Sequence, residues 1–126
     1  MARKLKSLPA KRSSCPIAAT LDRVGDKWSL LIIRDIGLFD KHRNKDFQDS
    51  TEGIPTNILA NRLKKLTEEG LIEKRLYEER PPRYEYHLTP AGRSLLPVIG
   101  AMADWASANI TGVKIPEAIE RQNSRS

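Results

Sequence analysis

A helix that ends at a glycine and leads directly into a β-hairpin is the feature of this sequence that most limits its fold. Over 55–69 the leucines recur at three- to four-residue spacing, which predicts one amphipathic helix. Gly70 supplies the left-handed residue that ends this helix. The segment 71–88 then alternates as two strands around a proline pair with charged neighbours. Any core for this chain must therefore leave room for a projecting two-stranded ribbon.

Apolar spacing and capping residues predict further helices on both sides of this unit. Pro16 and Pro90 each suit a first helical position, because a proline has no N–H that would lack a partner there. Pro97 removes one hydrogen bond inside the last helix and predicts a bend. The predicted helices are 16–24, a helix capped by Asp26 that runs to Gly37, a short helix capped by Asn44 that holds Phe47, and 90–110. With the hairpin, this is the element order of a winged helix-turn-helix, a mainly α fold with a small β-hairpin.

The last predicted helix is apolar over a wider surface than a helix that faces one core. Its apolar positions fill about half of the circumference. Part of this surface is therefore expected to face a second copy of the chain. The predicted dimer contacts are Leu95, Ile99, Met102, Trp105 and Ala106.

Charge and cysteine content narrow the class of partner. The 126 residues suit one domain, and 22 Lys and Arg against 16 Asp and Glu give a net charge of +6. This charge favours a polyanion, with double-stranded DNA ahead of an anionic membrane surface. The longest apolar run is far too short to span a bilayer and no signal sequence opens the chain, so a cytoplasmic protein without a membrane partner is expected. A single cysteine excludes an internal disulfide.

Composition divides the chain into three predicted parts. Residues 1–14 form a flexible basic arm, which either contacts DNA or is a solvated tail. Residues 15–112 form the winged helix-turn-helix domain, including its dimerisation helices. Residues 113–126 form a polar C-terminal tail that is frayed from Glu117 onward.

Three stretches of the sequence resemble one family of known proteins. They are CPIAATLDRVGDKWSLLIIRDI from Cys15, EGIPTNILANRLKKLTEEGLIEK from Glu52 and PPRYEYHLTPAGRSLLPVIGAMADW from Pro81. In this order they resemble the HxlR-type regulators of the MarR-like winged-helix group. The resemblance implies a homodimeric bacterial transcription regulator on a pseudo-palindromic operator, dimerised through its first and last helices. Asn44 departs from the family, because many members have an aromatic residue there.

The polar face of the 55–69 helix is the predicted DNA-reading surface. The resemblance places Thr56, Asn57, Asn61 and Lys64 toward DNA, and the amide of asparagine matches the major-groove edge of adenine. Arg62 lies at the border of the apolar side and is expected to bind phosphate, with a structural ion pair as the alternative. At the basic tip of the hairpin, Arg80 and Arg83 are expected to meet the DNA backbone.

Cys15 is a candidate sensor of oxidants or electrophiles. It begins a helix and follows Lys11 and Arg12, a setting that favours the reactive thiolate. Some members of the resembled family use a cysteine at this place as a sensor. The alternative is a small apolar residue packed at the dimer interface. A small-molecule effector of unknown identity is a further partner to consider.

Neither catalysis nor metal binding has support in the sequence. His42 and His87 are 45 positions apart, with no cysteine or carboxylate at ligand spacing. The sequence also has no phosphate-cradling glycine loop and no nucleophile elbow. No cofactor, no metal and no enzymatic activity are therefore expected. The alternative function is a winged-helix module that binds an acidic protein, and DNA affinity that falls steeply with salt would argue against it.

Overall fold

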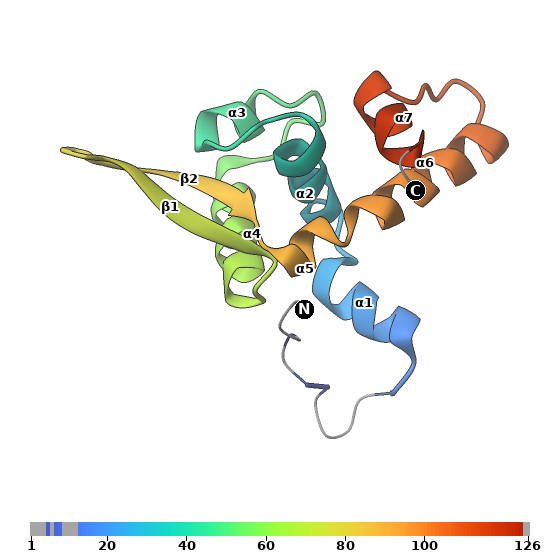
Figure 1. Cartoon of the computed structure of the whole chain (residues 1–126), viewed down its shortest axis with the longest axis horizontal. Coiled ribbons are helices and arrows are strands. Elements are labelled where there is room, and N and C mark those ends of the chain that lie inside the picture. Colours follow the sequence, from blue (N-terminus) through green and yellow to red (C-terminus); the bar gives the residue numbers. More distant parts are fainter. Residues whose placement is uncertain (1–4, 6, 9–12, 125–126) are drawn as a thin grey trace.

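A helical body carries a projecting two-stranded wing in the computed structural model, which describes residues 5, 7, 8 and 13–124 (Figure 1). The elements are α1 (Pro16–Val24), α2 (Ser29–Leu38), α3 (Asn44–Gln48), α4 (Thr56–Glu68), β1 (Ile72–Glu79), β2 (Pro82–Leu88), α5 (Pro90–Arg93), α6 (Leu96–Asn109) and α7 (Glu117–Ser124). Strand β1 pairs antiparallel with β2, from Ile72 opposite Leu88 to Glu79 opposite Pro82. The predicted mainly α fold with a small β-hairpin is confirmed.

One hydrophobic core joins α2, α4, α6 and the base of the wing. The predicted apolar face of α4 is confirmed, because Leu59, Leu63 and Leu66 are at most 2% exposed. Burying one such leucine stabilises the fold by about 1.5–3 kcal/mol relative to leaving it exposed. The other buried members of the core are Val24, Ile32, Ile33, Ile36, Phe47, Leu71, Ile72, Leu88, Leu96 and Ile99. The core thereby fixes the root of the wing relative to α4.

The junction between α4 and β1 is held from several sides. Gly70 has φ of +80°, the left-handed conformation predicted for the residue that ends α4. Beside it, the Arg23 guanidinium donates to Glu69 at 2.7 Å and ties the end of α1 to the end of α4. Leu5 also packs against the core next to Gly70. The charged residues of the predicted arm 1–14 lie outside the described residues.

Carboxylates cap the helices of the body. Helix α2 begins at Ser29, so Trp28 and not the predicted Asp26 is the residue before the helix, but Asp26 still serves this end because its Oδ2 accepts the backbone N–H groups of Trp28 and Ser29 at 3.0 and 3.1 Å. The prediction that Asn44 caps α3 is wrong, because Asn44 is already the first helical residue. Asp46 serves instead, since its carboxylate accepts backbone N–H groups that precede the helix.

The predicted last helix is divided into α5 and α6. Thr89 caps α5 by accepting the Gly92 N–H at 3.1 Å, and the chain turns at Ser94 and Leu95 before α6 begins. The bend predicted at Pro97 therefore lies slightly earlier in the chain. Pro97 sits in the first turn of α6, where a backbone N–H needs no helical partner.

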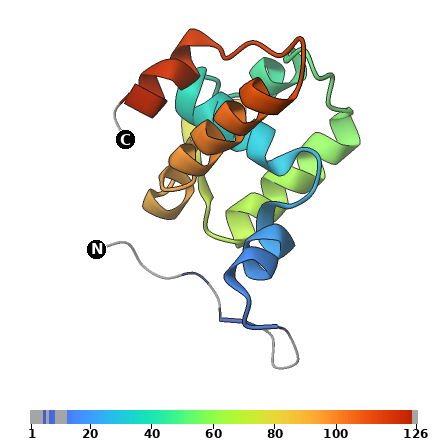
Figure 2. The ribbon, with the colours of Figure 1, turned by 90° about the vertical axis from the view of Figure 1, so that its right-hand side faces the viewer.

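The C-terminal segment contains a helix where the sequence predicts a frayed tail. Helix α7 folds back against α6 (Figure 2). Ile119 is 5% exposed. The Asn123 amide donates to the Asp104 carboxylate at 2.9 Å and to the Gly100 carbonyl at 3.3 Å. The expectation of fraying is wrong for 117–124, because these residues form a helix that is packed through Ile119 and hydrogen-bonded to α6 through Asn123.

Candidate nucleic-acid interface

Helix α4 presents a polar face opposite its buried leucines. Thr56, Asn57, Asn61 and Lys64 are all exposed and follow one another along this face. The structure therefore brings the four predicted base contacts together on one surface. Whether they contact DNA stays a prediction.

Arg62 is held by a partner within the chain. Its Nε donates to Asp26 Oδ2 at 2.7 Å, and its guanidinium also donates to the Asn61 side chain. The structural ion pair named as the alternative is thus present, and this geometry gives the expected phosphate contact no support. Burial alone would raise the pKa of Asp26, but hydrogen bonds from Ser29, Arg62 and the backbone outweigh it and lower that pKa to about 2.

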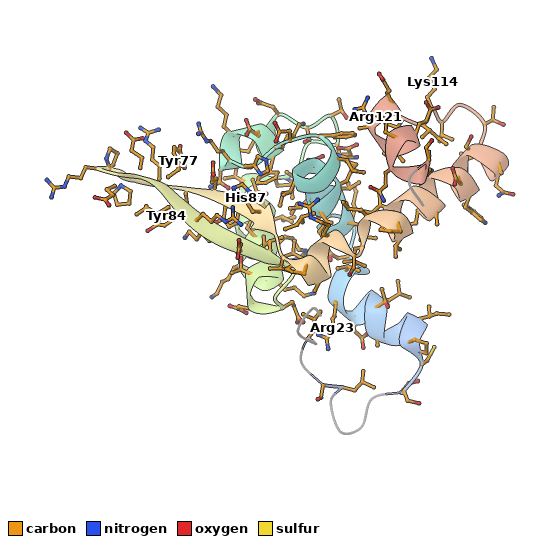
Figure 3. The ribbon with its side chains drawn as sticks, in the orientation of Figure 1. Arg23, Tyr77, Tyr84, His87, Lys114 and Arg121 are labelled. Carbon is orange, nitrogen blue, oxygen red and sulfur yellow. The ribbon has the colours of Figure 1, made fainter. Side chains whose placement is uncertain are left out.

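The wing carries its arginines at an exposed tip, where β1 ends and β2 begins. Arg80 and Arg83 are exposed, and Arg83 Nε lies 3.2 Å from Glu78. Figure 3 shows Tyr77 and Tyr84 along the same ribbon. The hairpin is not basic as a whole, because four cations are matched by four carboxylates: Lys74, Arg75, Arg80 and Arg83 against Glu73, Glu78, Glu79 and Glu85. The expectation of a basic tip thus reduces to two arginines with acidic neighbours.

The base of the wing is anchored by residues that the sequence did not single out for this role. The Tyr86 N–H donates to the His42 carbonyl at 2.7 Å, so the connection before α3 pairs briefly with β2. The guanidinium of Arg43 lies over the Tyr77 ring, 4.0 Å from its centroid. His87, labelled in Figure 3, stacks on His42. Both histidines are therefore structural here, and no sequence pattern pairs residues so far apart.

The predicted dimer residues divide into two groups. Met102 and Trp105 are 52% and 64% exposed on α6. Ile99 is buried in the core of the single chain and Leu95 packs partly against that core, so the single chain already covers much of their apolar surface, and their place in a dimer interface stays a prediction. Ala106 is half-buried. The helical pattern of 90–110 showed how wide the apolar surface is, but not which part of that surface the chain itself covers.

Cys15 is exposed immediately before α1. Its backbone N–H donates to Ser13 Oγ at 3.1 Å. Lys11 and Arg12, on which its predicted activation depends, lie outside the described residues. Over the part of the chain that the structure describes, no three His, Cys, Asp or Glu side chains gather as a metal site, and no helix is long and apolar enough to cross a membrane.

Comparison with known proteins agrees with this architecture. Residues 23–114 match the model of the HxlR-like helix-turn-helix family. An uncharacterised HTH-type transcriptional regulator of Synechocystis is 38% identical over 72% of this chain and 70% of its own length. A MarR-family regulator from Porphyromonas gingivalis superposes with a TM-score of 0.69 at 34% identity, over 83% of this chain and all of the other. The redox regulator HypR in its reduced form has a TM-score of 0.68 at 31% identity, over 77% of this chain and 95% of its own. The chain therefore belongs to the HxlR-like helix-turn-helix family of DNA-binding transcriptional regulators, with their winged-helix fold.

Proposed function

We propose that this regulator binds a specific double-stranded DNA site as a homodimer. The observation that carries the proposal is the exposed polar face of α4 beside a projecting wing. A helix of this kind fits the roughly 12 Å wide major groove, and a wing can follow the neighbouring backbone. Asn57 and Asn61 would read base edges, with Thr56 and Lys64 beside them, whereas Arg80 and Arg83 would contact phosphates.

The homodimer is supported by apolar side chains that a single chain leaves uncovered. Ile17 and Leu21 on α1 are 70% and 59% exposed, and Met102 and Trp105 on α6 are also exposed. Apolar patches of this kind mark interfaces between proteins. A two-fold dimer would present its two α4 helices to half-sites roughly 34–36 Å apart, so the operator would be an inverted repeat.

Regulation would be steric and would act in the cytoplasm. A dimer on a promoter blocks access of polymerase, and a change in the separation of the two α4 helices releases it. Cys15 is our candidate for one such signal, since its thiol is exposed and a redox regulator is among the similar structures. Because the chain has no second cysteine, the chemistry would be a small-molecule adduct or a Cys15–Cys15 bond across the dimer.

Two substitutions test the proposal because they should fail in different ways. Asn61→Ala should cost on the order of 1–3 kcal/mol on the selected operator and leave binding to random duplex nearly unchanged. Arg83→Ala should weaken both and lower the salt slope by roughly 1 unit. The operator is first obtained by selecting bound fragments from a DNA library. Equal losses of Asn61→Ala on both duplexes would contradict base reading, and affinity independent of salt would favour an acidic protein partner.

A further inference from the structure

A cleft of about 490 Å³ opens between the helical body and the C-terminal helix. Small-molecule sites are typically concave, mainly apolar and roughly 300–1,000 Å³ in volume. One wall comes from the end of α2 and from the connection between α3 and α4. The other wall, from α6, α7 and the segment between them, is apolar and is formed by Ala103, Ala106, Val113, Ile115, Pro116 and Ile119. The cleft thus has the size and the lining of a ligand site.

The charges around this cleft favour an anion. Arg34 is paired with two carboxylates, those of Asp35 and Glu52, at 2.7 and 2.9 Å. Lys41 donates to a neutral hydroxyl, that of Ser50, at 2.9 Å. Lys114, on the opposite side, is exposed and labelled in Figure 3. Among the described residues, the cations that line the cleft, Arg34, Lys41 and Lys114, exceed its lining carboxylates, Asp49 and Glu52, by one, whereas Asp35 is buried and is not part of the lining.

The wall opposite α7 is connected to the recognition helix. Ser50 Oγ donates to the buried Asp35 carboxylate at 2.7 Å, and the ion pair of Arg34 holds Glu52. This segment is thereby tied to α2 on one side. On the other side it leads within three residues to Pro55, the residue that precedes α4. A molecule that moves this wall therefore moves the start of α4.

We propose that the cleft binds small amphiphilic anions, with a mainly apolar body and one carboxylate or sulfonate, and that its occupation changes DNA affinity. The apolar body would lie against α6 and α7, with the anionic group toward Lys41 and Lys114. Helix α7 begins beyond the residues 23–114 that match the family model, so the part of this wall from Ile115 to Ile119 lies outside the matched region. The effect on DNA rests on the proposed function, whereas the binding itself does not.

A titration of the full chain with 4-phenylbutanoate tests the binding, with 4-phenylbutan-1-ol as its uncharged match. In ¹⁵N–¹H NMR spectra the anion should shift the amide signals of 49–52, 103–106 and 113–119. Lys41→Gln and Lys114→Gln should each weaken binding by about two- to fivefold, because each removes one solvent-accessible charge. Lys45→Gln, an exposed lysine on α3 away from the cleft, is the matched control and should leave the affinity unchanged. Ala103→Leu should weaken binding on the order of tenfold, because the added side chain occupies the apolar side.

The outcomes separate the site from its effect on DNA. Equal affinity for the acid and the alcohol, or shifts confined to the exposed faces around Ile17 and Trp105, would overturn the site. With the site established, phenylbutanoate should change the duplex affinity of the wild type, and Ala103→Leu should need on the order of tenfold more of the anion for the same change. The same concentration dependence in both proteins, or no change in either, would overturn the regulatory part. A chain that binds no duplex DNA would refute the proposed function, while the NMR titration would still decide the site.

Discussion

The imidazole rings of His42 and His87 are stacked, with centroids 4.5 Å apart and planes inclined by 20°. His42 belongs to the connection before α3 and His87 to β2, so the stack joins the helical body to the wing. His42 Nδ1 lies 2.9 Å from the Tyr86 carbonyl oxygen, and Nε2 lies 2.8 Å from Asp40. The His42 ring therefore contacts both β2 and Asp40. The hydrogen bond from His87 lowers the pKa of Glu85, which keeps the carboxylate beside this stack charged.

His42→Ala should loosen the wing from the body. The variant keeps the carbonyl that accepts the Tyr86 N–H but loses the ring contacts that hold it in place. We expect faster hydrogen exchange at Tyr86 and a loss of about 1–3 kcal/mol in the free energy of unfolding. His87→Phe keeps a stacked ring and should have the smaller effect. Unchanged exchange at Tyr86 in His42→Ala would show that the backbone pairing needs no support from the stack.

Asp26→Asn should reduce the stability of the fold at neutral pH and should make that stability less dependent on pH in the acid range. The folded-state pKa of Asp26, about 2, is below its ordinary 3.8. Its carboxylate therefore stabilises the fold above pH 3.8, and this contribution is lost as the pH falls toward 2. We expect a deficit of about 1–2 kcal/mol at pH 7, reduced for the partial solvent contact of the carboxylate. Urea unfolding across this range measures it, and a deficit of equal size at about pH 2.5 would contradict the assignment.

Local sequence patterns predicted the parts of the fold that depend on the spacing or the backbone conformation of neighbouring residues. The leucine spacing of α4 and the left-handed Gly70 are such cases, and both are confirmed. The burial of Ile99 in its own chain could not be predicted from such a pattern, because helical periodicity does not show whether an apolar side chain packs against its own chain or against another. The stack of His42 and His87 depends on a contact between distant segments. The attachment of α7 depends on Ile119 in an otherwise polar stretch, which periodicity does not detect.

Replacement of the five basic residues of the N-terminal arm by glutamine should weaken binding to any duplex. Residues 1–12 carry five cations and no acid, so this segment accounts for most of the net charge of +6. If its charges meet phosphates, the slope of log affinity against log salt should fall by about 0.9 for each lost contact. The replaced residues are Arg3, Lys4, Lys6, Lys11 and Arg12. An unchanged slope would mean that the arm is a solvated tail.

Cys15→Ser should abolish any response of DNA binding to oxidants. The wild-type thiol is exposed, and a serine hydroxyl does not ionise near neutral pH. Operator affinity measured with and without a mild thiol oxidant should change in the wild type alone. Met102 is an alternative target of oxidation, because its side chain is 52% exposed. The same response in both proteins would assign the effect to methionine oxidation and leave Cys15 without a sensing role.

Trp105→Ala should separate the proposed dimer without unfolding the chain. Trp105 is 64% exposed in the single chain, so its removal leaves little cavity in the core, whereas in a dimer it would anchor the apolar surface of α6. Ile99→Ala is the matched control on the same helix, because Ile99 is buried and its loss should cost about 2–5 kcal/mol of folding free energy. Sedimentation at micromolar concentration, combined with thermal unfolding, distinguishes the two effects. A wild type that sediments as a folded monomer and binds one half-site as tightly as an inverted repeat would overturn the proposed dimer.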